Sequence, residues 1–229
     1  MIGISWLIVL LVWACAGESA ESKDATDTKP AGREVSEASI SGPIAQSLIA
    51  NYFPEEVLLA TDRIKASFEA GIRLPSEADS SLVYLYKQHA RRLRLHFFDK
   101  DPISGVFPFN GKASLSQQAE LVDRLPYMSG LCGFQKESGE TINYYCPNLD
   151  ETYFDYLEEL GKNSEIITEF ARTYQETKVI IPAVRQQMLM NAIEDLDLSD
   201  YDHQLFYSLF QFWVAEEISA SLAIQAVGE

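Results

Sequence analysis

Residues 203–215 read HQLFYSLFQFWVA, an aromatic and apolar run without Asp, Glu, Lys or Arg. Its polar members Gln204, Ser208 and Gln211 are spaced by four and three residues, so a helix would carry them on one side. The remaining positions supply large hydrophobic side chains in every other direction. We therefore predict that this run is a helix and that it forms the centre of a hydrophobic core.

The boundaries of this helix follow from its flanks. Ser199 and Asp202 stand ahead of the run in the spacing of a capping box, which predicts a helix start at Ser199 and a long helix that reaches Val227. Glu216 and Glu217 interrupt the apolar run. Two carboxylates in the middle of a helix argue against a membrane span.

Helix signals recur through the preceding chain. Pro43, Pro54 and Pro182 suit the first turn of a helix, Gly71 suits a helix end, and Ser or Asp residues stand where caps are needed. The helices predicted ahead of the final one cover residues 43–51, 54–70, 76–98, 114–126, 150–161, 164–178 and 182–196, and a loop covers 99–111. The sequence therefore predicts an all-α fold of seven or eight helices in one domain, residues 42–229.

Composition limits the possible functions. The chain has 229 residues, 47% of them hydrophobic and 23% charged, with a formal net charge of −16. These proportions are those of a globular protein. Strong negative charge argues against a nucleic-acid-binding groove, which needs net positive charge. We expect no nucleic acid among the partners.

The N-terminus has the features of an export signal. Residues 1–17 contain no charged side chain, and Ser5 is the one polar residue between Ile4 and Ala14. This run is shorter than the roughly 20 residues of a membrane-spanning helix and has the length of a signal-peptide core. Val12, Ala14 and Cys15 end it in a sequence that resembles the lipobox of bacterial lipoproteins.

That resemblance implies a location in the cell. Residues 1–14 would be a signal peptide, and Cys15 would become an acylated N-terminus that carries palmitate or similar chains into a membrane. Because Ala16 and not Asp follows the cysteine, the resemblance points to the outer membrane, with the protein facing the periplasm. Two alternatives remain: cleavage after Ala16 to give a soluble secreted protein, and an uncleaved membrane anchor.

The next segment predicts a tether. Residues 16–41 contain six acidic and three basic side chains, many small residues and almost no large apolar ones. Such a segment cannot bury enough surface to offset the entropy lost on ordering. We therefore expect residues 15–41 to be the acylated cysteine and a disordered acidic tether.

The two other cysteines predict one disulfide. Cys132 and Cys146 remain once Cys15 is lipidated or removed, and an exported chain favours pairing. Residues 134–136 and 141–145 resemble short strands around a turn at Gly139, which lies equally far from both cysteines. A hairpin with that turn places the cysteines opposite each other. The bridge would contribute about 3 kcal/mol; the alternative is two free thiols.

Helix 76–98 carries a basic cluster and two histidines. Lys87, Arg91 and Arg94 share one side of this helix, where they could bind an acidic partner or anionic headgroups. The alternative is a solvated face paired with local acids. His89 and His96 share the apolar side and are either hydrogen-bonded core residues or a metal-binding or general-base pair.

No catalytic or metal motif emerges. The chain has no Gly-x-Ser-x-Gly, no phosphate-binding glycine loop and no Cys-x-x-Cys, and its acidic run 194–202 lacks the glycine and final acid of a calcium loop. We assign no catalytic residue and expect no metal or cofactor. Asp200 and Asp202 would stabilise the dipole of the last helix.

The sequence thus favours a non-catalytic binding or assembly protein, anchored by lipid in the periplasm, with a protein partner in the envelope. An inhibitor or immunity-type protein is one form of this hypothesis. The first alternative is an envelope hydrolase that uses His203 or a buried Glu216 or Glu217. The second is a carrier that holds a small apolar ligand among the aromatic residues of the last helix.

Overall fold

The computed structural model describes residues 41–99, 119–128, 130–135, 139–178, 187–188, 191–192 and 194–225, all within one compact unit, Ser39–Glu229. The described part is mostly helical and contains a single two-stranded antiparallel sheet, which confirms the predicted fold class. The signal peptide 1–14, the lipidation residue Cys15 and the tether up to residue 40 lie outside the described residues.

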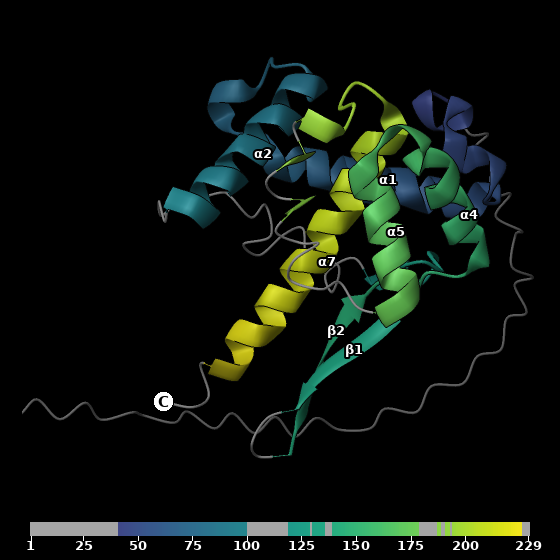
Figure 1. The fold of residues 1–229 in the computed structure, drawn as a ribbon. Coiled ribbons are helices and arrows are strands. Elements are labelled where there is room, and N and C mark those ends of the chain that lie inside the picture. The colour runs from purple at the N-terminus through teal and green to yellow at the C-terminus, as the bar shows by residue number, and fades with distance from the viewer. Residues whose placement is uncertain are drawn as a thin grey trace, which may run out of the picture. The chain divides into compact units, whose positions relative to one another are not determined.

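The described residues form six α-helices (Figure 1). They are α1 Glu55–Ile72, α2 Leu82–Asp99, α3 Ala119–Val122, α4 Glu151–Leu160, α5 Glu165–Thr177 and α7 Tyr201–Gln225. The 3-10 helices are η1 Pro43–Gln46, η2 Leu48–Asn51, η3 Pro75–Glu77 and η5 Gly161–Asn163, and the strands are β1 Gly130–Gln135 and β2 Thr141–Cys146.

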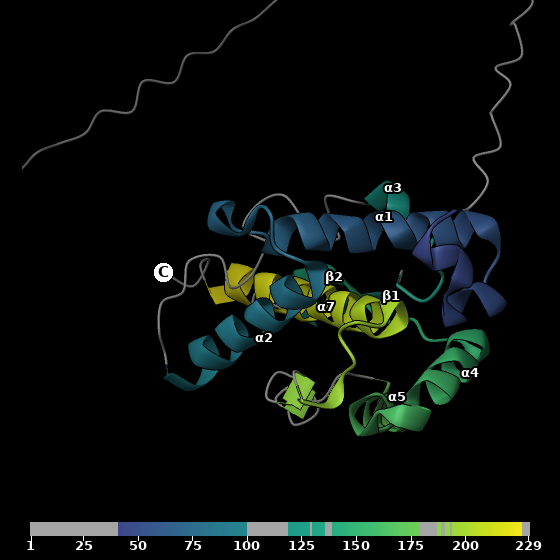
Figure 2. The same ribbon diagram turned by 90° about the horizontal axis from the view of Figure 1, so that it is seen from above.

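Helix α7 is the centre of the core, as predicted. Every residue from Asp202 to Glu216 is buried, and Figure 2 shows α7 between α1 on one side and the α4–α5 pair on the other. Phe170 of α5 packs against Phe206 with ring centroids 5.3 Å apart, whereas Phe68 of α1 packs against Phe212 at 6.0 Å. A helix that is buried all round needs no solvated face, and the side with Gln204, Ser208 and Gln211 is also covered.

Several predicted helix boundaries were wrong. Residues 43–51 form the two 3-10 helices η1 and η2 in place of one α-helix, and α1 continues through Gly71 because Ile72 is fully buried. Helix α2 begins at Leu82, since the carboxylate of Glu77 accepts the N–H of Leu74 and closes η3 ahead of it. Of the helices predicted over 114–126 and 182–196, and of the loop over 99–111, large parts lie outside the described residues.

The hairpin carries the predicted disulfide with a different register. Cys132 and Cys146 are bonded and their Cα atoms are 5.8 Å apart. The ladder, however, pairs Cys146 with Gly130 and Cys132 with Tyr144, so the bridge crosses the strands diagonally. Gly130 permits this pairing because a Cβ there would lie 2.7 Å from the carbonyl oxygen of Cys146. The predicted symmetry about Gly139 was therefore wrong, although the bond itself is confirmed.

Candidate functional site

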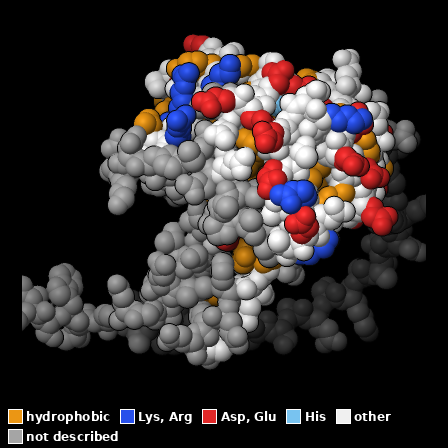
Figure 3. All heavy atoms as spheres, in the orientation of Figure 1, with side chains coloured by type: hydrophobic (Ala, Val, Ile, Leu, Met, Phe, Trp, Pro, Cys, Tyr) orange, Lys and Arg blue, Asp and Glu red, His pale blue; other side chains and the backbone are white. Residues whose placement is uncertain are grey.

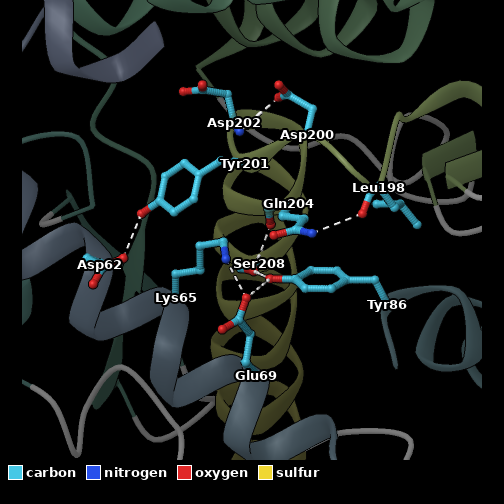
Figure 4. A network of polar contacts seen from close by, with 10 residues as sticks. All are labelled: Asp62, Lys65, Glu69, Tyr86, Leu198, Asp200, Tyr201, Asp202, Gln204 and Ser208. Carbon is cyan, nitrogen blue, oxygen red and sulfur yellow. Dashed lines mark hydrogen bonds and ion pairs between the residues drawn. The ribbon is translucent and has the colours of Figure 1, made fainter. Parts of the chain in front are cut away.

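A buried polar cluster joins α1, α2 and α7 (Figure 4). Lys65 on α1 is only 4% exposed and forms an ion pair with Glu69 one turn further along the same helix. Glu69 also accepts a hydrogen bond from the hydroxyl of Tyr86 at 3.2 Å, and that hydroxyl lies 2.8 Å from Oγ of Ser208. Each buried charge in the cluster thus has a charged or polar partner, as burial requires.

Aromatic rings complete the surroundings of Lys65. Its Nζ lies 4.6 Å from the ring centre of Tyr201, whose hydroxyl donates to Asp62 at 2.9 Å. The negative face of an aromatic ring stabilises a nearby ammonium group. Burial raises the pKa of Tyr86, and the charge of Glu69 raises it further. Tyr86 therefore stays protonated at neutral pH and acts as a hydrogen-bond donor.

A serine beside a tyrosine and a lysine can in principle carry nucleophilic chemistry. Here Oγ of Ser208 also donates to the carbonyl of Gln204 at 2.8 Å, and neither Ser208 nor Tyr86 is exposed. A substrate cannot reach this hydroxyl while α1 and α2 are in place. The cluster therefore holds three helices together.

His203, the candidate base of the hydrolase hypothesis, has a structural contact. Its ring is mostly buried, and Nδ1 accepts the backbone N–H of Asp197 at 2.8 Å. The carboxylate of Asp200 accepts the N–H groups of Asp202 and His203, so Asp200 caps α7 and the predicted cap Ser199 does not. Backbone hydrogen bonds at the start of α7 thus explain how the side chains of Asp200 and His203 are arranged.

The other titratable candidates are also engaged with protein. Of the two glutamates, Glu216 is buried and Glu217 is partly exposed. Nδ1 of His89 lies 2.9 Å from the hydroxyl of Tyr207, and the imidazole packs edge-on against Phe68, as expected for a core histidine. The side chain of His96 lies outside the described residues. Within the described ranges, no group of three His, Cys, Asp or Glu side chains could hold a metal ion.

Asp202 has a function that its sequence position did not indicate. Its carboxylate accepts the backbone N–H groups of Leu48 at 2.7 Å and Ile49 at 3.0 Å, together with the hydroxyl of Tyr156 at 3.1 Å. It therefore connects η2 and α4 to the first turn of α7. Burial raises the pKa of Asp202, although these donors oppose that shift.

The outer side of α2 carries a cluster of exposed basic side chains on a chain whose net charge is −16. Lys87, Arg91 and Arg94 are all exposed, and Tyr84 and Leu95 on the same side are each 45% exposed. We call these five residues the α2 face. Figure 3 shows basic side chains gathered over α2 at the upper left, with hydrophobic ones beside them. Helical spacing could have revealed Tyr84 and Leu95 in the sequence, because they lie eleven residues apart.

Local acids neutralise only part of this cluster. Arg92 at its inner edge pairs with Glu77 at 3.1 Å and donates to the carbonyl of Ile72. Arg94 lies 3.6 Å from Glu194. Lys87 and Arg91 have no ion pair with the residues that the structure describes. Among the described residues, two of the three exposed cations thus have no ion-pair partner.

A second surface feature is a groove between α4 and α5. Phe154 and Ala171 form its apolar part, and Arg172 lies at its side. Arg172 is paired with Glu169 at 2.7 Å and with Glu176 at 3.3 Å, so its charge is neutralised locally. This groove has less to offer a charged partner than the α2 face.

Comparisons with known proteins bring no relative to this chain. No family model, no curated protein and no solved structure matches it. Among the described helices, none combines the length and the apolar character that crossing a bilayer requires.

Proposed function

We propose that this chain is a lipid-anchored binding or assembly protein of the bacterial envelope that acts without catalysis. In this proposal Cys15 carries the lipid, residues 16–41 form the tether, and the helical domain faces the periplasm from the outer membrane. The observation that carries the proposal is the α2 face, where Lys87 and Arg91 are exposed and have no ion pair within the described part of the chain.

The composition of this face suits a protein contact. Arginine and tyrosine are enriched at the centres of protein interfaces, where they supply much of the binding energy. Tyr84, Arg91 and Leu95 lie along the middle of the outer side of α2, with the other two cations at its edge. This exposed row of cations favours an acidic partner at close range, whereas the net charge of −16 of the whole chain opposes it.

The tether supports the same proposal. A lipid anchor restricts a protein to a thin layer at the membrane and so raises its effective concentration toward other envelope proteins. A weak interface can then be occupied without a large contact area. The structural contact of His203 gives no support to the hydrolase alternative that uses this residue. Glu216 is buried, as the other form of that alternative expects, and no group of three His, Cys, Asp or Glu side chains within the described ranges could hold a metal ion beside it.

The anchor is tested by the intact mass of the protein extracted from the membranes of its native cells. We expect a mass that begins at an acylated Cys15, and we expect the Cys15→Ser variant to leave the membrane fraction. A mass that begins after Ala16 would instead identify a secreted protein and overturn the anchor.

The interface is tested by photo-crosslinking in those cells. A photoreactive phenylalanine derivative replaces Tyr84 in one strain and Arg172, on α5, in a control strain. We expect one discrete protein adduct from position 84 and none from position 172, and we expect Lys87→Ser with Arg94→Ser to abolish the adduct. No adduct at position 84, or the same adduct from both positions, would overturn the proposed interface.

A further inference from the structure

We infer that the α2 face recognises an acidic helical segment of its partner, whose carboxylates repeat at intervals of three and four residues. This inference rests on the proposed function and specifies the chemistry of its partner. It follows from the spacing of the exposed residues on α2 and from the acids that border them.

The spacing defines the length and order of the ligand. Lys87, Arg91 and Arg94 follow each other at four and three residues, which is about 10 Å along a helix axis. Tyr84 and Leu95 lie beyond the two ends of this row, about 16 Å apart. A helix laid along α2 would meet these positions in the same order: an apolar residue, three carboxylates and a second apolar residue.

The neighbouring acids limit the width of the ligand. Glu194 lies 3.6 Å from Arg94 and its side chain is 70% exposed. Asp197 is also exposed, and hydrogen bonds from Ser199 chiefly lower its pKa, with a smaller contribution from Lys87. An extended anionic surface would bring many charges within a Debye length, about 8 Å, of both acids. A single helix brings near these acids only the carboxylates that bind the row of cations, so fewer like charges meet and a helix fits better than a membrane.

The existing ion pair does not block such a ligand. Arg94 is 49% exposed in its pair with Glu194, and exposed pairs of this kind add little stability. A carboxylate from the partner can replace Glu194 in the ion pair with Arg94. Lys87 and Arg91 form no ion pair with the described residues that a ligand would have to displace. Arg91 has the donor geometry for a bidentate bond to a carboxylate at the centre of the interface.

A labelled synthetic helix tests this inference with the full-length protein. The probe carries Glu at positions i, i+4 and i+7, with Leu on the same face beyond both ends. A second probe has the same composition, but its Glu residues are distributed around the helix. Fluorescence anisotropy at physiological salt should show binding of the first probe, at least tenfold weaker binding of the second, and weakening of both as salt rises.

Two variants test whether the probe binds the cations of the α2 face or any exposed cation of the protein. Lys87→Ser with Arg91→Ser should weaken binding of the first probe at least tenfold, whereas Arg172→Ser on α5 should leave it unchanged. Circular dichroism checks that each variant is folded. Equal binding of the two probes, or equal binding by the two variants, would overturn the inference.

Vesicles distinguish the competing ligand. If phosphatidylglycerol vesicles bind the protein through Lys87 and Arg91 while the first probe does not bind, the α2 face is a membrane contact and the inference is wrong. If neither binds but position 84 still crosslinks to a protein in cells, the inference fails and the proposed function stands. If the crosslink is absent as well, both fail.

Discussion

The hydroxyl of Tyr86 on α2 lies 2.8 Å from Oγ of Ser208 on α7, and neither residue is exposed. The two residues are 122 positions apart in the sequence, so the contact fixes α2 against the central helix. Because the same phenol donates to Glu69 of α1, one side chain connects three helices. Tyr86 lies on the buried side of α2 together with Leu85 and Leu93, which leaves the α2 face on the outside.

Replacement of Tyr86 by Phe should lower the free energy of unfolding by about 1 kcal/mol. The loss is moderate because Ser208 retains its hydrogen bond to the carbonyl of Gln204 and Glu69 retains its ion pair with Lys65. Urea denaturation measures it, with Tyr84→Phe on the exposed side of α2 as the control. A loss above about 4 kcal/mol would contradict the view that the neighbours retain partners.

Removal of Lys65 alone should cost more than removal of the whole ion pair. Lys65→Met leaves the largely buried carboxylate of Glu69 without its cation, and we expect a loss of about 3 kcal/mol. Lys65→Met combined with Glu69→Leu should recover most of that loss, because no unpaired charge remains. If the double variant is as unstable as the sum of the two single variants, the two residues do not act as a pair.

The raised pKa of Asp202 predicts how the stability of the protein depends on pH. Because the folded-state pKa of Asp202 is raised, the folded protein binds its proton more tightly than the unfolded chain does. Its contribution to stability is therefore fully present below the unfolded pKa of about 3.9 and decreases as pH rises through the folded pKa. The deficit of Asp202→Asn relative to the unmodified protein should grow as pH is lowered from 7 toward 4.

Asp197 provides the opposite control. Hydrogen bonds from Ser199 lower its pKa, so its contribution is present above the unfolded pKa and lost as pH falls through the folded one. The deficit of Asp197→Asn should shrink at low pH. Urea midpoints measured from pH 7 to 3.5 would distinguish the two carboxylates, and parallel trends for both variants would contradict this account.

The disulfide is expected to stabilise the hairpin against α7. Replacing both Cys132 and Cys146 by Ser should cost about 3 kcal/mol, because the bridge closes a short loop and β2 lies against α7. Reduction of the unmodified protein should lower the free energy of unfolding by the same amount. Urea denaturation with and without dithiothreitol measures this difference. A dithiothreitol effect of similar size in the double variant would show that the stabilisation has another source.

Local patterns in the sequence were sufficient for the general fold. The run 203–215 holds many large aromatic and apolar side chains and no Asp, Glu, Lys or Arg, and this predicted a core helix correctly. The number and position of Cys132 and Cys146 predicted their bond. Helical spacing also grouped Lys87, Arg91 and Arg94 on one side of α2, and the structure finds all three exposed there. Their contact with a partner remains a proposal.

Long-range contacts account for what the sequence did not indicate. Asp202 has the position of an ordinary helix-start acid, but its acceptors are used by Leu48 and Ile49, more than 150 residues away. Glu77 is likewise turned toward Leu74 and Arg92, which delays the start of α2 to Leu82. The hairpin register depends on the close backbone approach at Gly130, which symmetry about a turn does not predict.

The attachment of η2 to α7 has a mechanical consequence. The chain passes through η1 and η2 before it reaches α1, and the carboxylate of Asp202 holds two amide groups of η2. A force applied to the chain ahead of Gly42 would therefore act on the first turn of α7 before it could separate α1 from the domain. The buried central helix then bears this force in place of α1.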